Sequence, residues 1–510
     1  AKIPWNLVEQ CLSDVDEEDL EDRRDEKLVN LSLLQSLGDN CYEFHPLIRE
    51  FCRNKLSGLD LVEEMKQNIC RVIVDATRKI PDDITVEQVK EVEIEIPHIT
   101  EIADNLAEYL SDDDLITSFM RLGRFYEAKG SYSQAQPWLE KAKEKVERQA
   151  EKNNADIATV YNMLARLYKL QGKYENAESL YLQSIEIKKR VLPKNHPDLA
   201  SSLNNLGNLY YSQGKYEAAE PFYLKDIEIK KIVLPNNHPD LASSLNNLAG
   251  LYKSQGKYEA AESLYVQSIE IKKRVLSENH PDLASSLNNL GNLYYSQGKY
   301  EAAESLFLKA SEIYKIALPE NHPDTASILN HVANLYKSQG KYENSETLYQ
   351  QSIEIYKIAL PENHPNITSS FNDLAGLYYL QGKYKDAEYW YLQAREIYKI
   401  ALPENHPDIA MNFNNLAGLY YSKGKYEEAK HWYLKALEIY KISLPRNHPN
   451  IASSLKNLAN LYKYQGKYKD AEHLFLKALE INKIVLPENH PDIASILNNQ
   501  AELYCIQGKY

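Results

Sequence analysis

Apolar and small residues recur along most of the chain with the spacing of a helix that buries one face. In residues 197–212, Leu203, Leu206, Gly207 and Tyr210 fall at positions i, i+3, i+4 and i+7. Gly214 follows directly and is typical of a helix C-cap in the left-handed region. The pattern therefore predicts one amphipathic helix that ends at a glycine turn.

A second stripe with helical spacing follows the glycine. It contains Ala219, Tyr223 and Ile227, and it stops before Pro235, which cannot continue a helix. The small side chain of Ala219 lets the second helix approach the first. The two stripes together predict an antiparallel helical hairpin.

The hairpin is repeated. The tripeptide Gly-Lys-Tyr recurs with a step of 42 residues, and Gly-Ser-Tyr replaces it at Gly130, so that the glycines are Gly130, Gly172, Gly214, Gly256, Gly298, Gly340, Gly382, Gly424, Gly466 and Gly508. A fixed period of this size indicates a solenoid in which stacked hairpins bury one continuous core. The predicted fold class is therefore all-α.

Composition narrows the function classes. The chain has 510 residues and a formal net charge of −14, which argues against a nucleic-acid-binding protein. It contains no apolar run long enough to span a membrane. Its five cysteines are scattered and form no C-x-x-C pair, which favours a reducing cytoplasm.

The connector between hairpins contains a repeated Asn-His-Pro element, as in "ALPENHPDIA" at residues 401–410. Pro407 suits the first helical turn, His406 suits the N-cap, and Asp408 suits the positive helix end. Eight such histidines, from His196 to His490, are spaced by whole hairpins of about 10 Å, too far apart to share one ion. We therefore expect no metal site there.

The motif Leu206-Gly207, Tyr210, Ala219 and Tyr223 resembles the tetratricopeptide repeat. The long second helix and the "VLPENHPD" connector resemble the variant found in kinesin light chains. The resemblance covers residues 116–510, as nine full repeats and the first helix of a tenth. It implies a right-handed α-solenoid whose first helices line a concave surface.

Polar residues form a second stripe beside the apolar one on each first helix. The resemblance to kinesin light chains implies that asparagines there hold the main chain of an extended peptide, because an amide offers both donors and an acceptor. Candidate groove residues are Asn162, Arg166, Lys169, Asn204, Asn208, Tyr211, Asn246, Lys253, Asn288, Asn292, Tyr295, Asn330, Asn334, Lys337, Asn372, Tyr379, Asn414 and Tyr421. The alternative is a solvated face that the repeats simply copy.

The charge of this stripe differs from that of the whole chain. The stripe consists of the five positions equivalent to Ser201, Asn204, Asn208, Tyr211 and Ser212 in each of ten repeats. Together these positions carry a net charge of +5, from Arg124, Arg166, Lys169, Lys253, Lys337, Lys456 and Lys463 against Glu127 and Glu502. A basic groove in an acidic body would attract acidic segments. The predicted partner is therefore a protein or extended peptide with acidic side chains. Replacing Asn246, Asn288 and Asn330 by Ala is expected to weaken its binding and to spare folding.

Residues 1–115 lack the repeat. Residues 26–56 predict a helix, a short strand or turn around "DNCYEF" and a second helix, and they resemble the winged-helix end of NB-ARC-type STAND ATPases. The resemblance implies that His45, in Phe44-His45-Pro46, senses bound nucleotide, although Pro46 stands where the family has Asp. The predicted division is a winged-helix-like unit at 1–58, a helical adaptor at 59–115 and the array at 116–510.

Sequence motifs for catalysis are absent. Tyr follows every Gly-Lys, so no G-x-x-x-x-G-K-[ST] loop exists, and neither G-x-S-x-G nor H-E-x-x-H occurs. We therefore expect a non-catalytic sensor region of a STAND-type ATPase, with ADP or ATP bound in a domain upstream and no cofactor in this chain. One alternative is a static scaffold that resembles kinesin light chain and lacks nucleotide coupling. Another is self-association through the tenth repeat.

Overall fold

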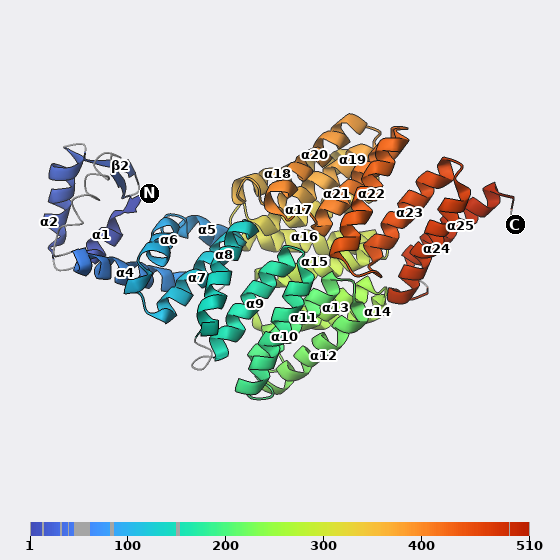
Figure 1. Cartoon of the computed structure of the whole chain (residues 1–510). Coiled ribbons are helices and arrows are strands. Elements are labelled where there is room, and N and C mark those ends of the chain that lie inside the picture. Colours follow the sequence, from blue (N-terminus) through green and yellow to red (C-terminus); the bar gives the residue numbers. More distant parts are fainter. Residues whose placement is uncertain are drawn as a thin grey trace. The chain divides into compact units, whose positions relative to one another are not determined.

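The structure is a computed structural model of the chain, and it describes residues 2–12, 15–30, 33–38, 40–44, 62–81, 86–148, 154–488 and 490–508. The chain divides into two compact units, residues 1–153 and 154–510. Each unit is described by itself (Figure 1).

The first unit begins with a small antiparallel sheet in the order β1-β3-β2. Its strands are β1 (Ile3–Pro4), β2 (Leu34–Gly38) and β3 (Cys41–Phe44). Helices α1 (Trp5–Cys11) and α2 (Glu17–Asp22) and the π-helix η1 (Arg23–Val29) accompany the sheet. Trp5, Leu20, Leu34 and Tyr42 form its buried cluster.

The prediction of a helix at the start of residues 26–56 is wrong for part of its length. The π-helix ends at Val29, and residues 34–38 form a strand that pairs with β3. Gly38 and Asn40 both have positive φ, 85° and 54°, which closes a tight turn between the two strands. Strand pairing across this turn outweighs the helical propensity of the leucines. The strand expected around "DNCYEF" is confirmed at Cys41–Phe44.

The other described residues of the first unit, from Val62 to Arg148, are mostly helical. The helices are α4 (Val62–Lys79), α5 (Val86–Val92), α6 (Ile96–Asn105), the 3-10 turn η2 (Ala107–Tyr109), α7 (Asp112–Ala128) and α8 (Tyr132–Arg148). The last two form the first hairpin of the array, which begins at Asp112 and groups with the amino-terminal helices. His45 and Pro46 lie outside the described residues, so the nucleotide-sensing role of His45 stays a prediction.

The second unit consists of eight further hairpins and one first helix. The hairpins are α9 (Asn154–Leu170) with α10 (Tyr174–Val191), α11 (Pro197–Ser212) with α12 (Tyr216–Val233), α13 (Pro239–Ser254) with α14 (Tyr258–Val275), α15 (Pro281–Ser296) with α16 (Tyr300–Ala317), α17 (Pro323–Ser338) with α18 (Tyr342–Ala359), α19 (Ile367–Leu380) with α20 (Tyr384–Ala401), α21 (Pro407–Ser422) with α22 (Tyr426–Ser443) and α23 (Pro449–Tyr464) with α24 (Tyr468–Val485). Helix α25 (Pro491–Ile506) starts the tenth repeat. The predicted all-α array is confirmed.

The caps behave as the sequence predicts. Gly214 has φ 66°, and the Lys215 N–H donates to the Tyr210 carbonyl, which closes α11 with a left-handed turn. His406 is the N-cap of α21 with φ −71° and ψ 137°, and Pro407 is the first helical residue. The sequence did not show that Nδ1 of His406 accepts the Asp408 N–H at 3.1 Å. The imidazole therefore takes the place of the usual Ser or Asp cap oxygen.

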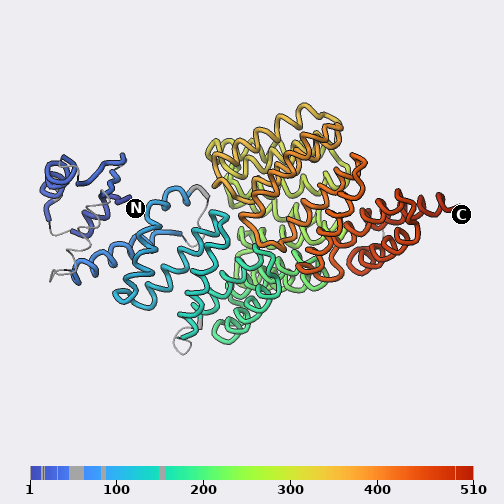
Figure 2. The backbone as a smooth tube through the Cα atoms, turned by 45° about the horizontal axis from the view of Figure 1, so that its top comes forward, coloured from blue at the N-terminus to red at the C-terminus, as the bar shows by residue number. Residues whose placement is uncertain are grey.

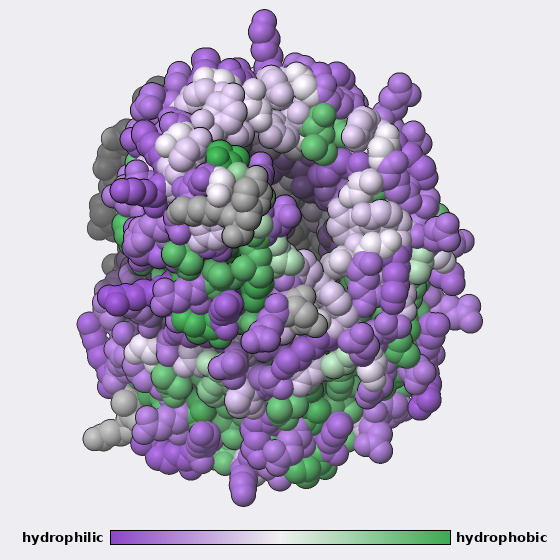
Figure 3. Space-filling model, turned by 90° about the vertical axis from the view of Figure 1, so that its right-hand side faces the viewer, coloured by the Kyte–Doolittle hydropathy of each residue, from purple (hydrophilic) through white to green (hydrophobic). Residues whose placement is uncertain are grey.

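The second unit winds around a hollow. Figure 2 shows its hairpins following one another around a common axis, and Figure 3 shows the hollow from the carboxyl-terminal side, with hydrophilic to near-neutral residues along most of its rim and hydrophobic residues on one side. The winding brings later repeats back against earlier ones. Nε2 of His406 lies 3.1 Å from the Leu170 carbonyl oxygen, 236 residues away along the chain. His406, His448 and His490 lie against the glycine turns at Gly172, Gly214 and Gly256.

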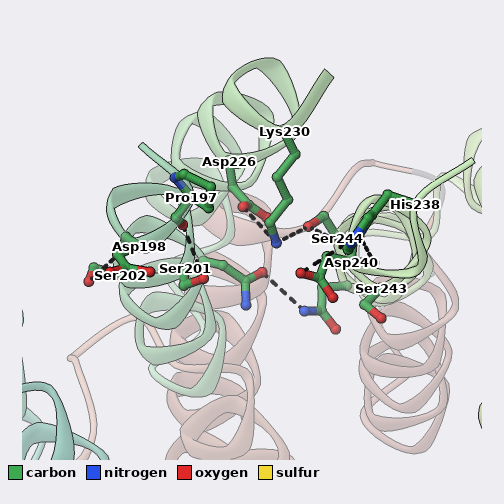
Figure 4. Close-up of polar contacts among 12 residues, drawn as sticks. Pro197, Asp198, Ser201, Ser202, Asp226, Lys230, His238, Asp240, Ser243 and Ser244 are labelled. Carbon is green, nitrogen blue, oxygen red and sulfur yellow. Dashed lines mark hydrogen bonds and ion pairs between the residues drawn. The ribbon is translucent and has the colours of Figure 1, made fainter. Parts of the chain in front are cut away.

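Buried polar side chains join neighbouring repeats in the first half of this unit. Lys188, Lys230 and Lys272, at equivalent positions of the second helices, reach the hydroxyls of Ser202, Ser244 and Ser286 on the next first helix at 2.8–2.9 Å. Lys230 differs from the other two because the fully buried Asp226 lies 3.0 Å from its amine (Figure 4). From Tyr314 to Tyr440, tyrosines replace these lysines, and Asn482 takes the position in the last full repeat.

Candidate functional site

The concave face is the polar side of the first helices in the second unit, where the residues equivalent to Asn204, Asn208 and Tyr211 lie. The first helices of neighbouring repeats, such as α11 and α13, contact each other directly. Polar side chains on this face therefore form rows that run from repeat to repeat.

The row that contains Asn204 is linked between repeats by its own amides. Asn162, Asn330 and Asn414 donate to Ser202, Ser370 and Ser454 of the following first helix, at 2.6–2.8 Å. Asn204 and Asn246 accept from Asn247 and Asn289 at 3.0 and 3.3 Å, and Asn288 pairs with His331 at 2.8 Å. Asn372 accepts from Asn412 at 3.0 Å. These asparagines hold the repeats together as well as facing the hollow.

These contacts mean that the triple Ala variant proposed from the sequence would not report on ligand binding alone. Asn330 is 5% exposed and bonded to Ser370, so replacing Asn246, Asn288 and Asn330 by Ala would leave buried partners unsatisfied. Such a variant would alter packing between repeats as well as any ligand contact. Other residues of the face are needed to separate binding from stability.

A second row contains the residues equivalent to Asn208. The oxygen Oδ1 of Asn208 accepts from the Tyr223 hydroxyl at 2.7 Å, and that of Asn334 accepts from the Tyr349 hydroxyl at 2.8 Å. Asn292 occupies the same position beside Phe307. Where the row has an asparagine and the second helix has a tyrosine, the amide thus satisfies the buried phenol.

Tyrosines make the third row. The hydroxyls of Tyr211, Tyr295 and Tyr379 lie 2.7–2.8 Å from Ser254, Ser338 and Ser422 of the next repeat. Tyr421 instead packs against the ring of Tyr464, with ring centroids 5.8 Å apart.

The cations of the face lie in partly dehydrated positions. Burial lowers the pKa of Lys169, Lys253 and Lys337, and Arg166 lowers that of Lys169 further. Lys337 is 2.7 Å from Oδ1 of Asn334 and lies near Asp373, whose charge raises the lysine pKa. No carboxylate among the described residues forms an ion pair with Lys253, so this amine faces the hollow with its charge uncompensated.

Sequence reasoning missed one row. It lies one residue after the Asn204 row and contains Asn247, Asn289, His331, Asp373 and Asn415. His331 stacks on Phe307, and burial with the nearby Lys253 lowers its pKa to about 4. Lys253 therefore lies close enough to His331, two repeats further along the chain, to disfavour its protonation. The 42-residue spacing of these residues was visible, but their direction depends on the helix rotation.

The histidine ladder has a structural role in the described repeats. Each of the eight histidines of the Asn-His-Pro elements accepts a backbone N–H two residues ahead through Nδ1, as in His238 with Asp240 at 3.1 Å. Among the described residues, no three His, Cys, Asp or Glu side chains gather as metal ligands would. No described helix is both long and apolar enough to cross a membrane.

The helical hairpins, their 42-residue repeat and the concave face define a repeat protein of the tetratricopeptide class. The chain belongs to the tetratricopeptide repeat family, whose profile matches residues 114–190, 170–231, 240–316, 324–400 and 408–484. No curated protein matches the sequence.

Several solved structures are similar to part of this chain. A putative kinesin light chain from Podosopora anserina with nearly identical TPR-like repeats is 24% identical, over 40% of this chain and 97% of that chain, with a TM-score of 0.34. A Rap protein complexed with competence and sporulation factor is 17% identical, over 73% and 98%, with a TM-score of 0.49. A STAND protein with a tetratricopeptide repeat sensor from Pyrococcus horikoshii is 17% identical, over 77% and 60%, with a TM-score of 0.39.

Proposed function

We propose that this chain is a non-catalytic binding module whose concave face holds an extended, acidic peptide or protein segment. The observation that carries the proposal is Lys253, which faces the hollow without a carboxylate partner in the described part of the chain and whose pKa burial lowers. A cation in such a position gains from an anionic ligand that replaces lost hydration. Arg166 and Lys169 extend the positive charge along the same face.

The rest of the face supports an extended ligand. Amide and hydroxyl groups follow one another from repeat to repeat, and array curvature gives a long concave surface. Such groups can pair with both the N–H and C=O groups of a peptide main chain. Acidic side chains of that peptide would then lie beside Arg166, Lys169 and Lys253.

The test uses a library of random 12-residue peptides displayed on phage and selected on the full chain at low salt. We expect acidic peptides to be enriched, and Lys253→Glu to weaken their binding about tenfold, which is ~1.4 kcal/mol. Lys337→Glu is the comparison variant, because Lys337 already has Asn334 and Asp373 nearby. The effect of Lys253→Glu should shrink in 0.5 M salt.

Titration of synthetic copies of the selected peptides by fluorescence anisotropy gives the dissociation constants. If acidic peptides bind wild type and Lys253→Glu equally well, the concave face is not their site. If no peptide is enriched, the array does not bind short linear segments and the proposal fails.

The wider role that we propose is that of a sensor in a STAND-type ATPase. Binding of a trigger to the array would shift the equilibrium of a nucleotide-binding domain upstream, which would hold the ADP or ATP. A cytoplasmic location belongs to the same proposal. The second candidate is a static scaffold like a kinesin light chain. The coding sequence upstream of Ala1 separates them, because only the sensor requires a G-x-x-x-x-G-K-[ST] loop there.

A further inference from the structure

Two consecutive repeats near the carboxyl-terminal end share an arrangement on the concave face that is also found in the repeat with Gly250 and Tyr265. Gly376 and Gly418 replace the asparagine of the Asn208 row, and the second helices of both repeats contribute a tyrosine. A Cβ atom on Gly376 would lie 3.8 Å from the Tyr391 hydroxyl, and one on Gly418 would lie 3.7 Å from the Tyr433 hydroxyl. Each glycine therefore leaves a notch that opens onto a phenol.

The two phenols lack the partner that their counterparts have. Tyr223 and Tyr349 donate to Asn208 and Asn334, but the side-chain hydroxyls of Tyr391 and Tyr433 form no hydrogen bond with any residue that the structure describes. Both tyrosines are 5% exposed. Their rings are thus fixed by packing while the hydroxyls point into the notches.

The notch at Gly418 opens into a pocket that Tyr391 also lines. A cavity of about 370 Å³ is lined by both tyrosines together with Gly418, Asn414, Asn457 and Asn460, among others. All of its lining residues are described, and none is an acid or a base. The pocket presents hydrogen-bond donors and acceptors and no charge.

We propose that this pocket binds an uncharged amide group of an extended peptide ligand. An amide carbonyl accepts from the phenols of Tyr391 and Tyr433, and an amide N–H donates to a side-chain oxygen of the lining asparagines, Asn457 and Asn460. A carboxylate or an ammonium group would lose hydration here without an opposite charge. The inference rests on the proposed peptide-binding function and adds a neutral recognition point to the basic part of the groove.

The amide can come from an Asn or Gln side chain or from the peptide main chain. Peptides selected on the full chain from the 12-residue phage library distinguish the two sources. If Ala in place of one Asn or Gln weakens binding, the side chain is the source. If only N-methylation of one main-chain amide weakens binding, the main chain is the source.

The key variant is Gly418→Asn, because it fills the notch with the residue that Asn208 and Asn334 already place beside a tyrosine. The fold should tolerate it for the same reason. We expect it to weaken the selected peptides at least about tenfold. The double variant Tyr391→Phe with Tyr433→Phe removes only the two hydroxyls and should also weaken binding of the selected peptides. The fold should tolerate it, since Phe307 and Phe475 occupy this position in sister repeats.

Gly250→Asn is the matched control, since Gly250 lies beside Tyr265 in a different part of the face and lines no part of this pocket. It should leave binding unchanged. Selected peptides that respond to Lys253→Glu but bind Gly418→Asn like wild type would overturn the pocket and leave the proposed function standing. A charged side chain whose contribution disappears in Gly418→Asn would also overturn it. Failure to select any peptide would overturn both proposals.

Discussion

Replacing Lys230 by Met is expected to destabilise the array by about 3–5 kcal/mol at pH 8, because it leaves a buried carboxylate without its cation. Asp226 is fully buried, and the Lys230 amine is 3.0 Å from it. Burial raises the Asp226 pKa, and Lys230 opposes that rise. Without the amine, the carboxyl must stay charged in an apolar site or take up a proton.

The pH dependence of this variant has a definite sign. A carboxyl whose folded pKa is raised above its unfolded value costs stability once the pH exceeds the unfolded value. The loss grows until the pH reaches the folded pKa. The deficit of Lys230→Met should therefore be smaller at pH 5 than at pH 8. Urea denaturation followed by helical circular dichroism at both pH values measures it.

Sister repeats supply the controls. Lys272 donates to the equivalent serine and also to the Asp282 carbonyl but has no buried acid beside it, so Lys272→Met should cost only about 1 kcal/mol. Asp226→Ser recreates the Ser268 and Lys272 pair and should change stability little. Asp226→Ser combined with Lys230→Met should recover most of the loss. Equal losses in Lys230→Met and Lys272→Met would show that the ion pair is not the cause.

The hairpin array could be predicted from sequence because the residues that form and end each helix lie within one repeat. The stripe through Leu203 and Leu206, the left-handed Gly214 and the helix start at Pro197 are local features, and each is present in the structure. The same reasoning failed at residues 34–38. There a single tight turn at Gly38 and Asn40 decides in favour of strand pairing, and no repetition reveals it.

The concave face could be predicted only in part. The rows of Asn204, Asn208 and Tyr211 were visible as periodic polar positions, and the structure places them along adjoining first helices. Which atoms of these rows already have partners depends on contacts with the next repeat, such as Asn247 with Asn204. The notch at Gly418 is one substitution in the sequence, and its meaning requires the position of Tyr433.

Contact between successive turns of the solenoid was not predictable from one repeat. The return of His406 to Leu170 depends on small rotations that accumulate over several hairpins. A change of a few degrees per repeat would remove it. The histidines therefore share one sequence motif but have two environments. Side chains of His406 and His490 are 9% and 13% exposed, whereas those of His196 and His238 are 34% and 36% exposed.

Acidification from pH 6.5 to pH 4.5 is expected to weaken the second unit through its buried histidines. Burial lowers the pKa of His448 to about 4, and it also lowers that of His406. Nδ1 of His448 accepts the Asn450 N–H at 3.0 Å, so a proton there removes the helix cap and adds a buried charge. His331 has a pKa of about 4 and lies against Phe307.

The sign follows from these lowered values. A histidine whose folded pKa is below its unfolded value of about 6.5 contributes its full stability above pH 6.5 and loses it as the pH falls toward 4. At pH 4.5 the loss is roughly 2 kcal/mol for each of His448 and His331, whose folded pKa is about 4. His448→Ser keeps a cap oxygen but cannot titrate, and His331→Asn recreates Asn289 of the preceding repeat.

Urea midpoints measured between pH 7 and pH 4.5 test this expectation. Each variant should lose less stability than wild type over this range, and the double variant should lose least. His238→Ser is the matched control, since His238 caps α13 in the same way but is more exposed. Carboxylates titrate in the wild type and in all variants, so only differences between them report the histidines. If His448→Ser and His238→Ser shift the pH dependence equally, contact between turns is not what makes the buried histidines sensitive to acid.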